Sequence, residues 1–217
     1  MSTNSTALVK LGSYLESRKA RIQAMLPAEA GITPGRLIRT ALMSVDENPV
    51  LLRCSPESLY KSIITAARYG LEIGGPLAQA YIVPYKDRAQ LIIGYRGLIA
   101  LVLRTGAASQ VVAEVVREGD HFERTMGIGG RITHHASKLP DRDEQPITHV
   151  YCQYLLSNGN IVEDVMTRAE VNRHAELYSK AASKADSPWN AAWTQMAIQP
   201  VLRRPVLRGL IPVTLTD

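Results

Sequence analysis

The sequence predicts an α+β fold, in which antiparallel β-hairpins and a β-meander with one inserted helix are flanked by N- and C-terminal helices. Apolar residues recur at helical spacing before residue 71 and after residue 167, and β-rich runs occupy the stretch between them. The links between these runs are too short for parallel crossovers, so we expect the strands to pair antiparallel. With 217 residues, the chain has room for one domain with a substantial core.

Three helices are expected in the first 70 residues. Leucines and isoleucines at residues 8–26 form an apolar stripe that Pro27 ends, and Pro34 begins a second helix. The third helix has the clearest boundaries, because Ser55 can cap its first turn and Gly70 can end it in the left-handed conformation.

A β-hairpin and a further helix follow. Tyr81–Tyr85 and Gln90–Tyr95 are β-rich runs, and Lys86-Asp87-Arg88 is the turn between them. The chain then changes from strand to helix at Gly94-Tyr95-Arg96-Gly97, and Gly106 closes this helix.

The second half begins with expected strands over Val111–Val116 and Phe122–Met126, followed by a long loop over residues 127–147. A second hairpin is expected over His149–Thr167, because Asn158-Gly159 favours a tight two-residue turn.

Helices are expected again near the C-terminus. The residues Thr167-Arg168-Ala169-Glu170 have the spacing of a capping box, which opens a helix toward Tyr178. A final helical stretch starts at Trp189, and we expect Pro200 and Pro205 to break or kink it.

Charge and cysteine content limit the choice of partner and compartment. The formal charge is +5, and residues 168–208 carry seven Lys/Arg against three Asp/Glu, which indicates an anionic partner. Cys54 and Cys152 are isolated, which suits unpaired thiols in a reducing cytoplasm. No apolar run approaches the roughly 18 residues of a membrane span and no secretion signal is found, so we expect a cytoplasmic protein without a membrane partner.

The motifs of several enzyme classes are missing. The glycine-rich stretch Met126–Ile132 lacks the Gly-Lys-Ser/Thr ending of a P-loop, and no serine lies in a Gly-x-Ser-x-Gly elbow. We therefore expect no catalytic residues, no cofactor and no bond-making chemistry.

Metal-dependent chemistry is a weaker alternative. His134 and His135 are adjacent, so in a strand they would face opposite ways and could not readily share a metal ion. A metal-dependent nuclease would need carboxylates to bind its metal ion. Asp141, Asp143 and Glu144 lie together in a Pro-flanked loop, and acidic loops of this kind are usually solvated. The carboxylates open to this alternative are Asp141, Asp143 and Glu144, or Asp120 and Glu123.

Cations are interleaved with aromatic residues along the first hairpin, where Tyr81, Tyr85 and Tyr95 alternate. Single-stranded nucleic acid is typically held by a basic groove with flat side chains for base stacking. Arg96 also lies at a helix N-terminus, where backbone N–H groups favour an anion. The pattern is equally compatible with tyrosines half-buried against helices and cations that solubilise the edge. The cations beside the tyrosines are Lys86, Arg88 and Arg96.

A second basic set follows residue 179. Arg203 and Arg204 are adjacent, so they lie about 100° apart on a helix and only one can point straight into a groove. A solvated helix face is the alternative reading. The members of the set are Lys180, Lys184, Arg203, Arg204 and Arg208.

Residues Ser58–Gly106 resemble the core signature of the RecT family of phage and prophage recombinases. That signature has a helix ending in Gly-Leu-Glu, a Gln-Ala-Tyr-x-x-Pro-Tyr strand, and Gln-x-x-x-Gly-Tyr-Arg/Lys-Gly-Leu before a basic helix that closes in Gly. The similarity runs from about Leu37 to about Arg204. The matching residues are Gly70-Leu71-Glu72, Gln79-Ala80-Tyr81, Pro84-Tyr85, Gln90, Gly94-Tyr95-Arg96-Gly97-Leu98 and Gly106.

The resemblance implies an ATP-independent protein that binds single-stranded DNA (ssDNA) and anneals complementary strands in phage-type recombination. It implies one annealing domain over residues 1–217, with residues 1–50 as a helical segment for oligomerisation, in the cytoplasm of a bacterial host. The implied partners are ssDNA and the annealed duplex intermediate, further copies of the chain in a ring or helical filament, a 5′→3′ exonuclease and the host single-strand-binding protein.

The resemblance also implies DNA contacts, carried over by matching position. Arg104 of the basic helix is a further candidate, and Arg203 lies beside a matched residue. The family's paired lysines are Ile198 and Gln199 here, and we expect the C-terminal partner-binding tail to be absent after Asp217. An inactive remnant of a prophage recombinase is therefore another alternative. The residues carried over are Lys86, Gln90, Tyr95, Arg96 and Arg204.

Overall fold

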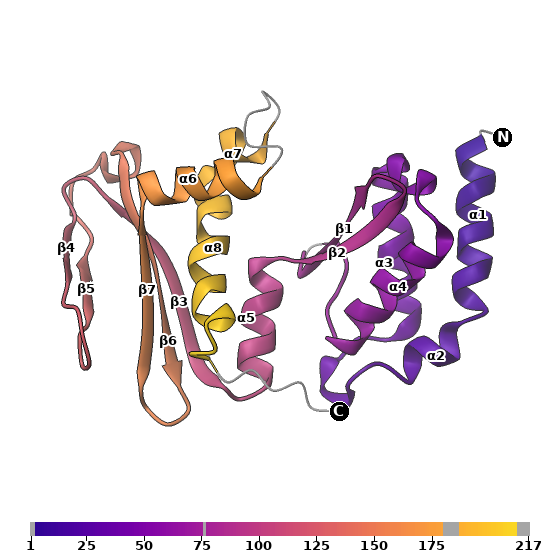
Figure 1. The fold of residues 1–217 in the computed structure, drawn as a ribbon, viewed down its shortest axis with the longest axis horizontal. Coiled ribbons are helices and arrows are strands. Elements are labelled where there is room, and N and C mark those ends of the chain that lie inside the picture. The colour runs from indigo at the N-terminus through magenta and orange to yellow at the C-terminus, as the bar shows by residue number, and fades with distance from the viewer. Residues whose placement is uncertain (1–2, 76, 180–186, 212–217) are drawn as a thin grey trace. The chain divides into compact units, whose positions relative to one another are not determined.

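The computed structural model describes residues 3–75, 77–179 and 187–211. Helices come first and last along the described chain, and antiparallel strands with one inserted helix lie between them (Figure 1), so the predicted α+β class is confirmed. The backbone divides into two compact units, unit 1 with residues 1–104 and unit 2 with residues 105–213, and each is described by itself.

Unit 1 consists of helices and one β-hairpin. The predicted starts of two helices are confirmed, because Thr33 caps the helix at Pro34 and Ser55 Oγ accepts the Ser58 N–H at the start of the next. Two short 3-10 turns, Ala28–Ala30 and Pro49–Arg53, connect helices. The elements are α1 (Thr3–Glu16), α2 (Lys19–Gln23), α3 (Pro34–Glu47), α4 (Pro56–Arg68), β1 (Ala80–Tyr85), β2 (Arg88–Ile93) and α5 (Tyr95–Arg104).

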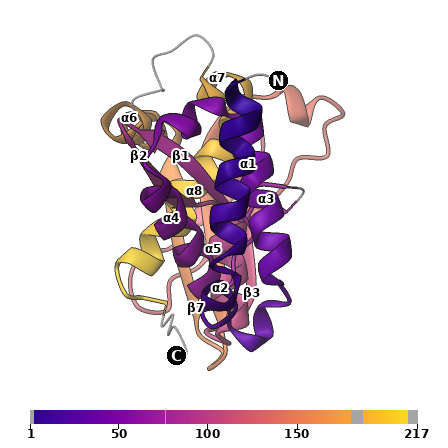
Figure 2. The same ribbon diagram turned by 90° about the vertical axis from the view of Figure 1, so that its right-hand side faces the viewer.

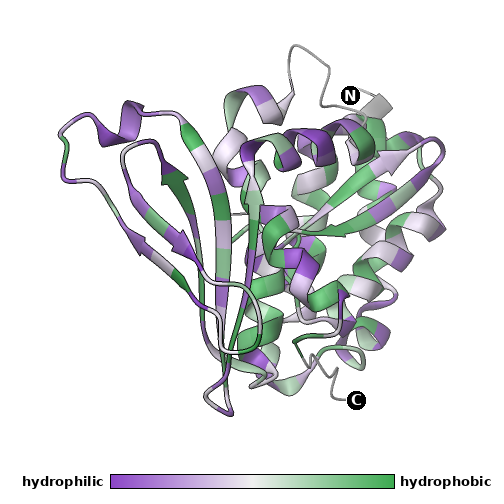
Figure 3. Cartoon of the chain, turned by 60° about the vertical axis from the view of Figure 1, so that its left-hand side comes forward, coloured by the Kyte–Doolittle hydropathy of each residue, from purple (hydrophilic) through white to green (hydrophobic). Residues whose placement is uncertain are grey.

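The core of unit 1 lies between the helices and the inner face of the hairpin. Leu15, Ile38 and Ile63 come from three different helices and are each at most 1% exposed. Helix α1 lies alongside α3 (Figure 2). Strands β1 and β2 carry both apolar and polar residues (Figure 3), and their inward residues Ile82 and Ala89 join the same core. The polar side of the hairpin is therefore turned away from the core.

Unit 2 is built on a three-stranded antiparallel sheet in the order β3-β6-β7. Helix α8 packs against this sheet (Figure 1), and the separate β4–β5 hairpin contributes Phe122 and Ile132 to an apolar cluster with Tyr151. The elements are β3 (Ala108–Arg117), β4 (His121–Arg124), β5 (Ile132–His135), β6 (Ile147–Leu156), β7 (Ile161–Thr167), α6 (Arg168–Tyr178), α7 (Pro188–Ala191) and α8 (Trp193–Leu207), with a 3-10 turn at Arg142–Glu144.

The strands of unit 2 differ in part from the sequence prediction. Strand β5 lies inside the segment predicted to be a loop, because its short Ile-Thr-His-His sequence has no clear alternation and is held by pairing with β4. Strand β4 covers His121–Arg124 rather than Phe122–Met126. The strands form separate β1–β2, β4–β5 and β3-β6-β7 sheets rather than one continuous meander.

Helix α8 contains both prolines that were expected to disrupt it, and a break at either position is wrong. Pro205 has no N–H for the carbonyl of Val201, four residues earlier. The buried Cys152 thiol donates to that carbonyl at 3.2 Å, and the Tyr154 hydroxyl donates to the next one, Leu202 O, at 2.7 Å. The sheet thus supplies a hydrogen bond that the proline removes from the helix.

Candidate nucleic-acid interface

The outward face of the β1–β2 hairpin combines aromatic, polar and cationic side chains. Tyr81 and Tyr85 are 42% and 45% exposed and lie four residues apart, about 13 Å along the strand. Their backbone neighbours Ala80 and Ile82 are buried, so the two rings face away from the core. The cross-strand pairs on this face are Tyr81 with Ile92, Val83 with Gln90, and Tyr85 with Arg88.

The tip of this hairpin presents Lys86. Tyr85 pairs with Arg88, so the turn is the two residues Lys86-Asp87. Lys86 has a φ of +57°, the left-handed conformation that such a tight turn requires, and its side chain is exposed. The predicted hairpin is therefore confirmed, but Arg88, which was predicted to lie in the turn, is the first residue of β2.

The backbone contacts at the corner between β2 and α5 explain why Gly94 and Gly97 are glycines. The Gly94 N–H donates to the carbonyl of Gln79 at 2.9 Å, and Gly94 O accepts the first helical hydrogen bond, from Leu98 N–H at 3.0 Å. At Gly97, a Cβ atom would lie only 2.2 Å from Gln79 O. Helix α5 therefore begins against the backbone of the preceding connector, and only glycine permits that approach.

Tyr95 and Arg96 form the first turn of α5. Arg96 is exposed, and its Nε donates to the Tyr95 hydroxyl at 3.3 Å. This hydrogen bond raises the pKa of the Arg96 guanidinium, whose carbon lies 5.8 Å from the centre of the Tyr95 ring. The helix N-terminus adds backbone N–H groups and a favourable dipole, so the corner is suited to a phosphate group.

A chain of hydrogen bonds holds this corner in place. Arg36 donates twice to the carboxylate of Glu72, at 3.1 and 3.0 Å, and Glu72 is only 1% exposed. The Glu72 N–H donates to Gln79 Oε1 at 3.0 Å, and Gln79 O accepts from Gly94. These residues were not among the predicted contacts. Glu72 and Gln79 lie in the Gly-Leu-Glu and Gln-Ala-Tyr motifs of the family signature, which was the signal for them, whereas no motif marks Arg36. The role of these residues is to support the corner.

Arg104 has a different position from the one predicted. Its guanidinium donates to Gly70 O at 2.9 Å and to Tyr69 O, the free carbonyls at the C-terminal end of α4. Burial lowers the pKa of Arg104. Its donors therefore serve as a cap for α4, and we place Arg104 outside the proposed DNA contacts.

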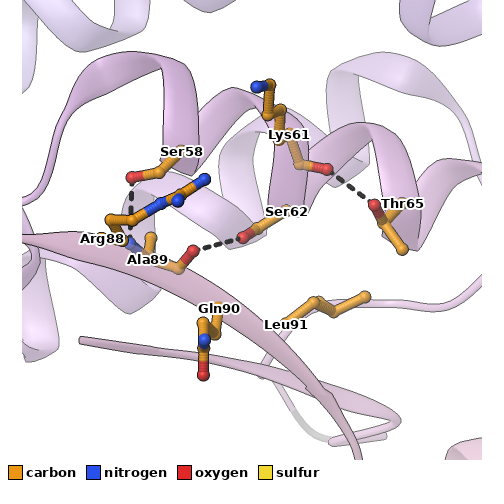
Figure 4. Close-up of a pocket in the computed structure, with 8 residues that line it drawn as sticks. All are labelled: Ser58, Lys61, Ser62, Thr65, Arg88, Ala89, Gln90 and Leu91. Carbon is orange, nitrogen blue, oxygen red and sulfur yellow. Dashed lines mark hydrogen bonds between the residues drawn. The ribbon is translucent and has the colours of Figure 1, made fainter. Parts of the chain in front are cut away.

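A groove runs between α4 and β2 (Figure 4). Lys61 on α4 and Arg88 on β2 stand on its two walls, and both side chains are exposed. The hollow has a volume of about 360 Å³. The residues that line it are Ser58, Lys61, Ser62, Thr65, Arg88, Ala89, Gln90 and Leu91.

The cations of α8 divide into exposed and ion-paired side chains. Arg203 is exposed, whereas Arg204 Nη2 lies 2.7 Å from Oδ1 of Asp164, whose side chain is only 5% exposed. Adjacent arginines thus point in different directions, as helical geometry requires. Lys180 and Lys184 lie outside the described residues.

Two carboxylates of the nuclease alternative, Asp120 and Asp143, are paired with arginine side chains of unit 2. Asp120 accepts two hydrogen bonds from Arg142, both at 2.8 Å, and others from backbone N–H groups and from His134 Nε2 at 3.0 Å. The Arg142 hydrogen bonds hold the pKa of Asp120 far below its usual range. Asp143 lies 3.5 Å from the Arg142 guanidinium, so these acids balance arginines of the same unit.

The two histidines of β5 do face opposite ways. His134 contacts Asp120 and Tyr151, whereas the ring of His135 stacks on that of His121 with centres 5.8 Å apart. His121 Nε2 lies 3.4 Å from Glu123. In residues 3–75, 77–179 and 187–211, no three His, Cys, Asp or Glu side chains are grouped to hold a metal ion. Over the same ranges, every helix is too short or too polar to span a bilayer.

Exposed rings beside exposed cations, on a hairpin and at a helix N-terminus, are the features of a nucleic-acid-binding protein. Comparison with known proteins identifies the family: the RecT family pattern matches residues 35–216. The chain is 34% identical to Protein RecT of Escherichia coli (strain K12) over 207 residues, 92% of this chain and 73% of that protein. It is 30% identical to the uncharacterized protein YqaK of Bacillus subtilis (strain 168) over 154 residues, 71% of this chain and 51% of YqaK. The chain belongs to the RecT family and is a recombination and annealing protein.

Proposed function

We propose that this chain binds ssDNA and anneals complementary strands without ATP, as an oligomer or filament assembled on the DNA. The observation that supports this most directly is the outward hairpin face, where Tyr81 and Tyr85 are exposed beside Arg88 and Gln90. Stacking on aromatic rings tolerates every base, and cations hold the backbone irrespective of sequence.

The annealing step needs no bond chemistry. Phosphates of the first strand contact Lys86, Arg88 and Arg96, and the neutralised charge lowers the repulsion felt by a second strand. Pairing between the bases supplies the sequence specificity, so the protein needs little direct base readout. The exposed Arg203 of unit 2 is a further proposed phosphate contact.

The wider assignment rests on family membership. We propose that residues 1–217 act as one annealing domain, with residues 1–50 in contacts between copies, in the cytoplasm of a bacterial host. A 5′→3′ exonuclease that produces ssDNA and the host single-strand-binding protein are the proposed partners.

The experiment is to mix labelled complementary oligonucleotides with the protein, without nucleotide or metal, and to follow annealing by energy transfer. Faster annealing than in buffer supports the proposal, and electron microscopy of the same mixture tests assembly. Degradation that requires Mg²⁺ would instead indicate the nuclease. Neither annealing nor ssDNA binding would indicate an inactive remnant.

A matched pair of variants tests the site. Arg96→Ala removes an exposed cation from the corner and is expected to weaken ssDNA binding while the unfolding curve stays unchanged. Arg131→Ala removes an exposed cation next to the start of β5 and serves as the control. Equal binding by the two variants would remove Arg96 from the site.

A further inference from the structure

The hydroxyl groups of the α4–β2 groove are used within the fold. Ser58 Oγ accepts the Ala89 N–H at 2.9 Å, and Ser62 Oγ donates to Ala89 O at 3.3 Å. Thr65 Oγ1 donates to Lys61 O at 2.8 Å (Figure 4). The two bonds to Ala89 fix α4 along the edge of β2. Ser58 Oγ also donates to Ser55 O at 2.8 Å, so the protons of all three hydroxyl groups are used. Among the described side chains that line the groove, those with donors outside these bonds are Lys61, Arg88 and Gln90.

The positive charge continues along α4. Lys61 and Arg68 are seven residues apart and both exposed, so they share one face of the helix about 10.5 Å apart along its axis. The acidic side chains Glu57 and Asp87 lie toward the other end, where Ser55 N–H donates to Asp87 O at 2.9 Å. The cationic part of the groove therefore begins at Lys61 and extends toward the C-terminal end of α4.

The groove and the outward hairpin face meet at β2. Arg88 and Gln90 belong to both surfaces, because they line the groove and also pair across the strands with Tyr85 and Val83. A strand that follows this edge can place its phosphates over the groove and its bases over the tyrosines. An anion beside Lys61 and Arg88 would be held by charge alone, without base recognition.

We propose that the α4–β2 groove binds the sugar–phosphate backbone of ssDNA and that Lys61 is a phosphate-contacting residue. This deepens the proposed function and rests on it. The groove separates the two components of binding, with backbone charge on the α4 side of β2 and base stacking on the side of Tyr81 and Tyr85.

The first experiment compares Lys61→Gln with Lys138→Gln, an exposed lysine in the loop after β5 that gives the same change in net charge. Binding of a labelled oligo-dT is measured by fluorescence anisotropy over a range of salt concentrations. Loss of one phosphate contact is expected to reduce the slope of log affinity against log salt by about 0.7, which is roughly a fivefold weaker affinity at 0.1 M salt. Lys138→Gln is expected to retain the wild-type slope.

The second experiment separates backbone from base contacts with an abasic oligonucleotide of the same length. Lys61→Gln is expected to weaken the binding affinity by the same factor for the abasic strand and for oligo-dT. Tyr81→Ala is expected to lose affinity for oligo-dT only. Equal loss by Tyr81→Ala on both strands would overturn the division between the two surfaces.

The outcomes distinguish the groove from the function as a whole. If Lys61→Gln matches Lys138→Gln in slope and affinity while the wild type binds oligo-dT, the groove assignment is refuted and the proposed function stands. A chemical-shift titration with inorganic phosphate that depends on Lys61, with an unchanged oligo-dT slope, would make it a site for free anions and would also refute the proposal. Wild-type protein that binds no ssDNA would refute the proposed function itself.

Discussion

Removal of Arg204 is expected to damage the fold before it affects DNA binding. Asp164 is 4% exposed and faces α8, where its Oδ1 accepts from Arg204 Nη2 at 2.7 Å and from the Val165 N–H at 3.0 Å. Removing one partner of a buried ion pair leaves a charge without compensation, which typically costs about 3–5 kcal/mol. The Arg204 side chain is 28% exposed, so water compensates part of the loss, and we expect about 2–3 kcal/mol for Arg204→Ala.

A double-mutant cycle measured by urea unfolding tests this expectation. Asp164→Ala alone leaves a half-buried guanidinium, and Arg204→Ala alone leaves a buried carboxylate. The double variant removes both charges and should recover at least about 1 kcal/mol relative to the sum of the single changes. If Arg204→Ala unfolds at the wild-type urea concentration yet binds ssDNA several times more weakly, the ion pair has no structural role. Arg204 would then be a DNA contact, as the position-matched prediction states.

Three further predictions follow from buried contacts. Cys152→Ala should lower the free energy of unfolding in urea by about 1–3 kcal/mol, because the Val201 carbonyl loses its hydrogen-bond donor. In a Pro205→Ala background the residue at 205 has an N–H for that carbonyl, so the loss should be smaller. An equal loss in both backgrounds would contradict this account. Gly97→Ala should cost about 1–3 kcal/mol, because the added methyl group meets backbone; an unchanged melting temperature would show that the corner can relax. Hydrogen bonds from Arg142 are the main cause of the lowered pKa of Asp120 in the folded state. The ionised carboxylate therefore contributes its full stabilisation of the fold above the unfolded pKa of about 3.9, and this contribution decreases as the pH falls below that value. Asp120→Asn should therefore reduce stability at pH 7 and flatten the pH dependence of unfolding between about pH 5 and 2, and a wild-type profile would refute the role of this carboxylate.

The elements that the sequence predicted well are those fixed by neighbouring residues. The capping hydroxyls of Ser55 and Thr167 act within three positions of themselves, and both helices begin where predicted. The hairpin between β6 and β7 also lies where predicted, but the two-residue turn is wrong. Leu155 pairs with Ile161 and the Leu156 N–H donates to Asn160 O, so the loop has three residues, and Gly159 alone of the Asn158-Gly159 pair has a positive φ. The outward position of Tyr81 between the buried Ala80 and Ile82 follows from strand periodicity, which is likewise local.

The features that the sequence could not give depend on distant partners. Strand β5 exists because β4 pairs with it, and the helix around Pro205 persists because Cys152 lies about 50 positions away in sequence but next to Val201 in space. Arg104 and Arg204 look like free cations in the sequence. Their buried partners, a helix end and Asp164, appear only once the chain is folded.

The family signature consequently has two physical components. Glu72, Gln79 and Gly97 do not face solvent as DNA contacts would; they join the connector after α4 to the first turn of α5 and leave no room for a side chain at Gly97. Tyr95 and Arg96 occupy the position that this framework creates, a helix N-terminus beside an exposed hairpin face. A pattern that mixes scaffold with contact residues identifies the family more firmly than it identifies DNA contacts. Lys61 is the opposite case, a proposed DNA contact that no motif marks. The packing of α4 on β2 brings it to the groove, so its position follows only from the folded structure.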